Sequence, residues 1–195
     1  MPSRSQRREK ILEAAGNAFL ANGYGDVTMQ DVAKEAQISR AALYTYFGSK
    51  QEVFNGVIEF FLSLIVRSSI DALKQVGEDA SIYDKLFAVL DARQRLWLGL
   101  DSSQKSTFSF ELIKSHHKII EEKGALPIQR LVKDVITQAY ATGELPTFAH
   151  TPPPDTGADT LFLSATAILF ADASEKTKSE NLATLLSVFS RGLSA

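Results

Sequence analysis

The stretch from Val27 to Lys50, VTMQDVAKEAQISRAALYTYFGSK, constrains the fold of this chain more than any other segment. It places three helix-start signals close together, and each is a hydroxyl residue that can cap a helix: Thr28, Ser39 and Ser49. The pattern predicts short helices over about residues 29–35 and 40–46, followed by the start of a third helix. Helices of this length are not stable alone in water, so both must pack against a neighbour.

The tight turn Ala36–Gln37–Ile38 between the two short helices is typical of a helix-turn-helix motif. In that motif the second helix enters the major groove of DNA, while flanking residues hold phosphates. The second helix here combines hydroxyl groups, cations and small side chains, which suit both tasks. The predicted DNA-binding residues are Thr28, Ser39, Arg40, Ala41, Ala42, Tyr44, Tyr46 and Lys50. The alternative that these residues leave open is a pair of packing helices with two exposed tyrosines.

The run ISRAALYTYFGSKQEVF, from Ile38 to Phe54, resembles a pattern found in the TetR family of transcriptional regulators: hydrophobic-Ser-x-Gly-x-Leu-Tyr-x-Tyr-Phe-x-x-Lys-x-x-Leu. The resemblance extends from Ile11 to Val57 and implies an N-terminal DNA-binding domain. It also implies a dimer in which the last two helices pair with their copies in a four-helix bundle. The chain departs from the family at Gln37, where glycine is usual, which predicts a left-handed backbone there at a cost of about 1–2 kcal/mol. It departs again at Ala41 and Ala42, where Gly and Thr are common.

The composition is that of a soluble protein with one large domain or two small ones, because 195 residues can bury a substantial core. No cysteine is present, which excludes a disulfide framework and a thiolate metal site. The net charge is −2, yet residues 1–50 carry seven Lys and Arg against five Asp and Glu. A basic head on an acidic body suits a protein that contacts DNA with one end. No apolar segment follows the N-terminal arginines, so we expect a cytoplasmic protein without membrane contact.

Hydrophobic periodicity predicts an all-α protein. The predicted helices span about residues 5–22, 29–35, 40–46, 49–76, 82–100, 104–123, 127–142, 157–173 and 178–193. Gly124 and Pro127 indicate a stop and a restart, and residues 144–155 indicate a Pro-rich connector. We therefore expect a three-helix DNA-binding domain at residues 1–48. A long helix would join it to a helical ligand-binding and dimerisation domain at 49–195.

Arg93 falls on the apolar stripe of the predicted helix 82–100, which is an unusual place for a charge. The guanidinium could anchor a ligand carboxylate or phosphate, or it could form a structural pair with Glu111 or another acid. If a ligand pocket exists, the expected lining residues are Phe61, Arg93, Trp97, Phe108 and Tyr140. The same aromatic helices could equally be a filled core.

The last two predicted helices suggest a homodimer. The helix at 157–173 is apolar nearly all round, and the helix at 178–193 has a strong apolar stripe, so one protomer would not cover both. The expected interface residues are Leu161, Phe162, Ile168, Leu169, Leu182, Leu185, Leu186 and Phe189. A two-fold dimer would require a near-palindromic operator on double-stranded DNA.

No constellation of residues suggests an enzyme, a cofactor or a metal centre. His116 and His117 are adjacent, so on a helix they would point about 100° apart, and one ion could not easily bind both. The sequence therefore favours a sequence-specific transcriptional regulator, most simply a repressor that a small-molecule effector releases from its operator. The alternative is a helical protein-interaction module without specific DNA binding.

Overall fold

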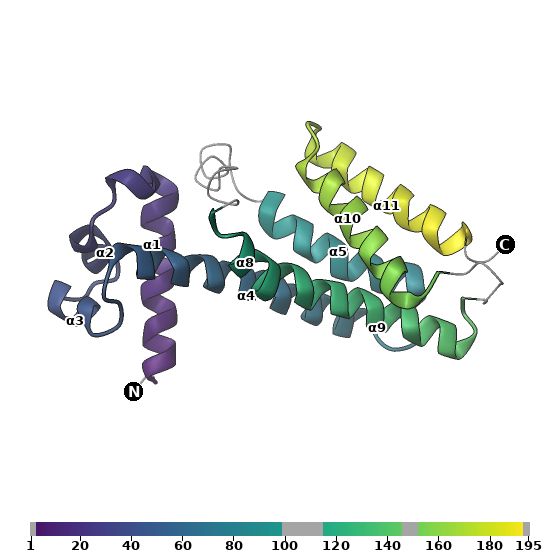
Figure 1. Cartoon of the computed structure of the whole chain (residues 1–195), viewed down its shortest axis with the longest axis horizontal. Helices are drawn as coiled ribbons and strands as arrows, with labels where there is room; N and C mark the ends of the chain where they lie inside the picture. Colours follow the sequence, from purple (N-terminus) through teal and green to yellow (C-terminus); the bar gives the residue numbers. More distant parts are fainter. Residues whose placement is uncertain (1–2, 99–114, 146–151, 193–195) are drawn as a thin grey trace. The chain divides into compact units, whose positions relative to one another are not determined.

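The computed structural model describes residues 3–98, 115–145 and 152–192, and every element in these ranges is a helix (Figure 1). The α-helices are α1 (Arg4–Asp26), α2 (Met29–Glu35), α3 (Arg40–Tyr44), α4 (Lys50–Val76), α5 (Ile82–Leu98), α8 (His117–Ile120), α9 (Leu126–Thr142), α10 (Pro154–Phe170) and α11 (Glu175–Gly192). A π-helical turn, η1 (Glu121–Ala125), joins α8 to α9. The predicted all-α class is confirmed.

The chain forms two compact units. Unit 1 comprises residues 1–64 with 100–123, and unit 2 comprises residues 65–99 with 124–195. The division falls inside α4, after Leu64, whereas the predicted domain boundary lies between residues 48 and 49. The difference arises because α4 contributes apolar side chains to the cores of both units.

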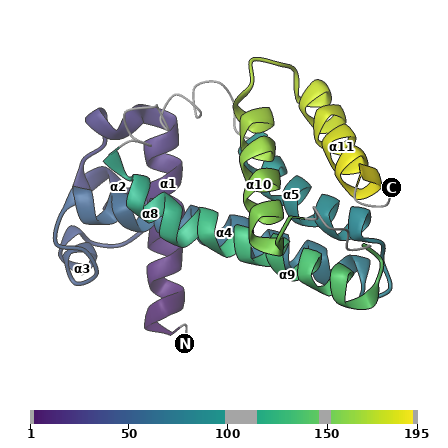
Figure 2. The same ribbon diagram turned by 45° about the vertical axis from the view of Figure 1, so that its right-hand side comes forward.

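The core of unit 1 forms where α1 to α4 bring their apolar faces together. α2 and α3 lie side by side next to α1 in both ribbon views (Figures 1 and 2). The large buried side chains are Ile11, Leu12, Phe19, Val32, Leu43, Phe47, Val53 and Phe54. α1 and α4 approach closely at Gly56, where a Cβ atom would lie only 2.8 Å from Cδ2 of Leu12. The two short helices thus obtain the neighbour that their length requires.

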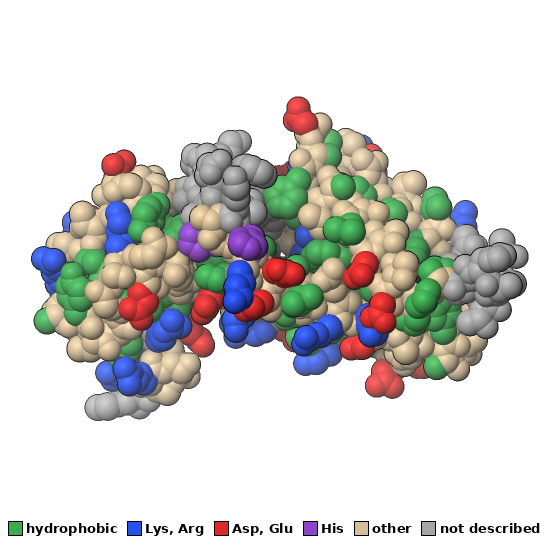
Figure 3. Space-filling model, viewed as in Figure 1, with side chains coloured by type: hydrophobic (Ala, Val, Ile, Leu, Met, Phe, Trp, Pro, Cys, Tyr) green, Lys and Arg blue, Asp and Glu red, His purple; other side chains and the backbone are tan. Residues whose placement is uncertain are grey.

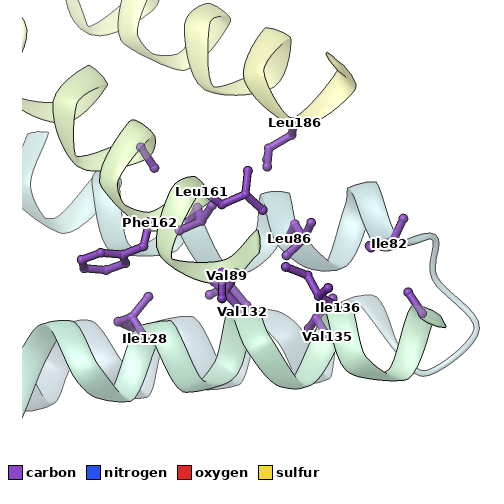
Figure 4. Close-up of a cluster of buried hydrophobic side chains, with 14 of the residues drawn as sticks. Ile82, Leu86, Val89, Ile128, Val132, Val135, Ile136, Leu161, Phe162 and Leu186 are labelled. Atoms are coloured by element: carbon purple, nitrogen blue, oxygen red, sulfur yellow. The ribbon is translucent and has the colours of Figure 1, made fainter. Parts of the chain in front are cut away.

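The core of unit 2 is built from α5, α9, α10 and α11 (Figure 4). The residues at its centre are Leu86, Val89, Val132, Ile136, Leu161, Phe162, Leu182 and Leu186. The backbone N–H of Ile82, the first residue of α5, donates to Oε1 of Glu144, just beyond the end of α9, at 2.6 Å. α5 and α9 therefore run in opposite directions, and the start of α5 lies beside the end of α9.

The observed limits of α2 agree with the sequence prediction, whereas the observed starts of the last two helices differ from it. α2 spans the predicted residues 29–35. The last two helices begin three residues earlier than predicted, at Pro154 and Glu175. Proline is favoured in the first turn of a helix, where its missing N–H costs nothing, and this explains the first case. In the second, Oγ of Ser174 accepts a bond from the N–H of Thr177 at 3.1 Å and so caps the helix.

The predicted stop and restart at Gly124 and Pro127 is wrong. Residues 117–142 form one continuous helical segment that passes through η1. Pro127 lacks an N–H and would crowd the carbonyl of the preceding turn in a regular α-helix. The wider π-helical turn lies directly before the proline, with Gly124 buried inside it, and relieves that crowding.

Among the described helices, α4 alone is long and apolar enough to cross a membrane, judged by length and composition. Its apolar residues are used inside the protein instead. Val53, Phe54, Val57 and Ile58 are buried in the core of unit 1. Val66 and Leu73 pack against the core of unit 2.

Candidate nucleic-acid interface

The turn between α2 and α3 has the left-handed residue that the sequence predicts. Gln37 has φ = 55°, the one positive φ at a non-glycine residue in the described part of the chain. The backbone N–H groups of Ala36 and Ile38 donate to the carbonyls of Val32 and Ala33, each at 2.9 Å, and hold the turn closed. The strain expected of a side chain at this position is therefore built into the motif.

A complete capping box fixes the start of α2. The hydroxyl of Thr28 donates to Oδ2 of Asp31 at 2.6 Å, and the backbone N–H of Thr28 donates to the same oxygen at 2.9 Å. Oγ1 of Thr28 in turn accepts from the N–H of Asp31 at 3.3 Å. The side-chain bond from Thr28 is the main reason why the pKa of Asp31 is lowered, followed by the backbone bond. Thr28 thus has a structural role at the edge of the predicted interface.

α3 buries one side and presents the other to solvent. Leu43 is fully buried, and Oγ of Ser39 caps the helix by accepting from the N–H of Ala42 at 3.0 Å. The outward side carries Arg40, Ala41 and Tyr44, all exposed. Nη2 of Arg40 donates to Oη of Tyr44 at 3.4 Å, and the guanidinium lies over the tyrosine ring. The exposed side of α3 therefore presents a cation paired with a phenol. The small side chain of Ala41 beside them leaves room for a binding partner to come close to the helix.

Lys50, predicted to bind phosphate, has a different role in the structure. Its Nζ donates to the carbonyls of Tyr24 and Val27, both at 2.8 Å, and of Gly25 at 3.2 Å. The ammonium also lies 4.5 Å from the centroid of the Tyr24 ring. An ammonium has three N–H donors, and all three are used here. Lys50 therefore fastens the end of α1 to the start of α4, and the assignment as a phosphate ligand is revised.

The N-terminal arginines are more ordered than a frayed tail. Ser3 and Gln6 form a capping box that starts α1, a signal that was present in the sequence. Arg4 donates from Nη2 to the carbonyl of Thr45 at 3.5 Å, and its guanidinium lies over the ring of Tyr46. Tyr46, one of the predicted DNA-binding residues, is half-buried.

Arg4 and the exposed Thr45 thus join the surface around α3, and neither is in the predicted set. Basic side chains also gather at the N-terminal end of α1 (Figure 3). Arg8 packs its guanidinium over the Phe47 ring at 5.0 Å, so part of this charge is anchored on the core of unit 1. The result is a fixed cationic edge beside α3.

The residues predicted to line a ligand pocket are divided between the two units. Phe61 belongs to unit 1, whereas Arg93 and Tyr140 belong to unit 2. Tyr140 lies near the end of α9, beside the start of α5. Arg93 lies eleven residues after Ile82, the first residue of α5, which is roughly 16 Å along the helix. The side chain of Trp97, the whole of Phe108, and the alternative partner Glu111 lie outside the described residues. The predicted pocket as a whole stays a prediction.

Most of the predicted dimer residues lie inside unit 2. Leu161, Phe162, Leu169, Leu182 and Leu186 are buried in its core, so they offer almost no surface to a partner. The exposed apolar side chains of the last two helices are instead Leu163, Phe170 and Val188. Ile168, Leu185 and Phe189 are half-buried. Because α10 is apolar nearly all round, its sequence alone did not show that these residues are buried within unit 2.

His116 lies within hydrogen-bonding distance of α4 rather than in a metal centre. Its Nε2 is 3.1 Å from Oδ1 of Asn55 and 3.4 Å from Nε2 of Gln51, and its Nδ1 is 2.9 Å from Oγ of Ser115. Within the ranges that the structure describes, no group of three His, Cys, Asp or Glu side chains could hold a metal ion.

Residues 11–57, which contain this motif, match the family model of bacterial regulatory proteins of the tetR family. The uncharacterized HTH-type transcriptional regulator YhgD of Bacillus subtilis (strain 168) is 32% identical over 89 residues, which cover 45% of this chain and 47% of YhgD. The negative transcriptional regulator IcaR of the biofilm operon icaADBC in Staphylococcus epidermidis is 24% identical over 103 residues, or 51% of this chain and 56% of IcaR. The matches thus span about half the length of these curated relatives.

The fold is shared along nearly the whole chain. A TetR-family regulator from Mesorhizobium loti MAFF303099 superposes with a TM-score of 0.75 at 17% identity, covering 96% of this chain and 97% of that one. AibR, solved with isovaleryl coenzyme A and operator DNA, superposes with a TM-score of 0.58 at 17% identity, covering 92% and 97%. The family match thus places a DNA-binding segment of the TetR family on residues 11–57, within α1 to α4, and the helices around it share the fold of a solved TetR-family regulator.

Proposed function

We propose that this protein is a sequence-specific, DNA-binding transcriptional regulator that works in the cytoplasm. We propose further that it is a repressor, that it binds a near-palindromic operator as a homodimer, and that a small-molecule effector releases it. The negative regulator IcaR, matched over about half of this chain, supports repression. AibR, whose structure holds both a coenzyme A thioester and operator DNA, supports an effector-controlled operator complex on this fold.

The observation that carries the proposal is the outward side of α3. Arg40, Ala41 and Tyr44 stand exposed on a helix whose other side is locked into the core of unit 1 by Leu43. An arginine and a phenol can donate to base edges or phosphates, and the alanine between them permits close contact with a thymine methyl group. Ser39 and the strained turn at Gln37 fix the direction of this helix. A preformed surface of this kind suits the major groove.

Selection of bound duplexes from a random DNA pool tests the proposal directly. We expect the full chain to enrich a near-palindrome, and gel-shift titration to give salt-dependent binding that is tighter on the enriched sequence than on scrambled DNA. Arg40→Ala should weaken binding and relax the preference at one position of each half-site, by roughly 1–3 kcal/mol. Arg67→Ala, an exposed arginine of unit 2, is the matched control and should leave binding unchanged.

Failure to enrich any sequence, with the protein folded, would favour the protein-interaction module instead. Under that alternative, residual DNA binding would be equal on all sequences, and Arg40→Ala and Arg67→Ala would weaken it to the same small extent.

The dimer is proposed on the exposed apolar side chains of α10 and α11. Leu163 and Val188 are each 65% exposed and Phe170 is 53% exposed, which is costly for large apolar groups in an isolated protomer. Val188→Asp should convert the dimer to a monomer in sedimentation velocity at micromolar concentration. Leu126→Asp, which changes an exposed leucine on α9, serves as control and should leave the dimer intact. A wild-type monomer under these conditions would refute the dimer.

A further inference from the structure

The guanidinium of Arg93 occupies an apolar position in unit 2. Arg93 continues the stripe of α5 that begins with Ile82, Leu86 and Val89, all of which are buried in the core. Its Cζ lies 4.4 Å from the centroid of the Phe162 ring on α10. Burial lowers the pKa of Arg93 to about 10, so the side chain is still a cation at neutral pH. Arg93 is half-buried, so water solvates it only in part and a compensating partner would stabilise the cation.

The partners that the structure gives to Arg93 are neutral. Nη2 donates to Oγ1 of Thr166 at 2.9 Å, and that hydroxyl in turn donates to the carbonyl of Phe162 at 2.6 Å. The buried carboxylate on the same helix, Asp91, is paired with Nε of Arg95 at 2.6 Å. Among the described residues, no carboxylate lies within ion-pair distance of Arg93. Its charge is therefore uncompensated within that part of the chain.

A second donor in the same turn of α5 also lacks an acceptor. Gln94 is only 3% exposed, and its Nε2 has no hydrogen-bond partner in the described part of the chain. A buried amide N–H₂ without an acceptor is rare in native proteins and points to an absent group. Arg93 has five N–H donors, of which the structure pairs one. Adjacent helical residues point about 100° apart, so Gln94 and Arg93 face different directions and their acceptors are separate. The acceptor that suits the remaining donors of Arg93, beside a cation, is an anionic group.

We infer that Arg93 anchors an anionic group, a carboxylate or a phosphate, of the small-molecule effector between α5 and α10. The inference deepens the proposed function and rests on it for the word effector, but the binding site itself can be tested without DNA. The guanidinium fork matches the two oxygens of a carboxylate or phosphate, and Phe162 and Thr166 fix its direction.

The test uses the full chain and defined probes: straight-chain carboxylates from acetate to octanoate, the matched neutral primary amides, and inorganic phosphate with phenyl phosphate. Binding is measured by calorimetry and by the shift in melting temperature. We expect a carboxylate, a phosphate or both to bind, with each amide at least about tenfold weaker, because the loss of one charge-assisted bond has that effect. Arg93→Met should abolish the discrimination between acid and amide. Arg130→Met, an exposed arginine on α9, should keep it.

Arg93→Met should also leave the melting temperature unchanged or raise it, since the variant removes an uncompensated charge. Equal binding of acids and amides, or no binding of any anion by wild-type protein that still binds its selected operator, would overturn the inference and leave the proposed function standing. A double-mutant cycle tests for an internal ion pair. If Arg93→Met and Glu111→Gln each lower stability equally, and the double variant loses no more than either, the two residues form a pair and the inference is overturned. Loss of specific DNA binding by the wild-type protein refutes the proposed function alone, because anion binding is read without DNA.

Discussion

Replacing Lys50 with Met keeps an unbranched side chain but removes the ammonium that donates to the carbonyls of Tyr24, Gly25 and Val27. Two of these bonds are partly buried and the third is exposed. A hydrogen bond to a charged group contributes about 1.5–3 kcal/mol, and a released lysine side chain regains up to about 2 kcal/mol of rotamer entropy. The two partly buried bonds outweigh that entropy, so Lys50→Met should lower the free energy of unfolding by about 2 kcal/mol.

Thermal unfolding of the full chain, followed by circular dichroism, measures this loss. A change of this size lowers the melting temperature by about 4–8 °C in a chain of this length. Lys10→Met, which alters an exposed lysine on α1, is the control and should stay within about 0.5 kcal/mol of the wild-type protein. The reasoning would be refuted by an unchanged melting temperature together with a salt slope of DNA binding reduced by about one, because that is the behaviour of a phosphate ligand.

Three further perturbations probe the motif and its support. Gln37→Gly should raise the free energy of unfolding by about 0.5–1 kcal/mol in urea titration, since relief of the left-handed strain exceeds the backbone entropy that glycine adds. Gly56→Ala should lower it by about 1 kcal/mol, because the new methyl group would meet Leu12 at 2.8 Å and overpack the α1–α4 contact. Asp31→Asn should destabilise the protein at neutral pH, and the difference from wild type should vanish as acid protonates Asp31.

The sign of the acid effect follows from the lowered pKa of Asp31. The capping box favours the charged carboxylate in the folded state, so its contribution is complete above the unfolded pKa of about 4 and disappears as the pH falls through the lower folded value. A constant difference between the wild-type protein and Asp31→Asn from neutral pH down to roughly pH 2 would contradict this account. For the other two variants, a loss of stability in Gln37→Gly or a gain in Gly56→Ala would show that the strain or the close approach is misjudged.

Local signals in the sequence were sufficient where a single turn decides the structure. The span of α2, the left-handed Gln37 and the end of α4 before Gly77 each depend on a few adjacent residues, and all three were predicted correctly. The role of Lys50 was missed because its acceptors lie at the end of α1, more than twenty residues earlier. Only the packing of α1 against α4 brings them within reach of the side chain.

The burial of the predicted dimer residues was missed for a different reason. An apolar stripe identifies the buried side of a helix only if the other side is polar, and α10 is apolar nearly all round. Its sequence therefore does not distinguish Leu161, which is buried, from Leu163, which is exposed. Which side of α10 is buried depends on α9 and α11, which pack against it only in the folded chain.

The division of the chain inside α4 has a consequence for cooperativity. The helix begins at the cap supplied by Ser49 and ends before Gly77, but it has no capping residue at Leu64, where unit 1 gives way to unit 2. If unit 2 unfolded alone, the shortened helix would end at a point where its last four carbonyls have no donors except water. Melting one unit would therefore expose backbone groups of the half of α4 that the other unit keeps, which raises the free-energy cost of melting either unit alone. We therefore expect the shared backbone of α4 to make the unfolding of the two cores cooperative.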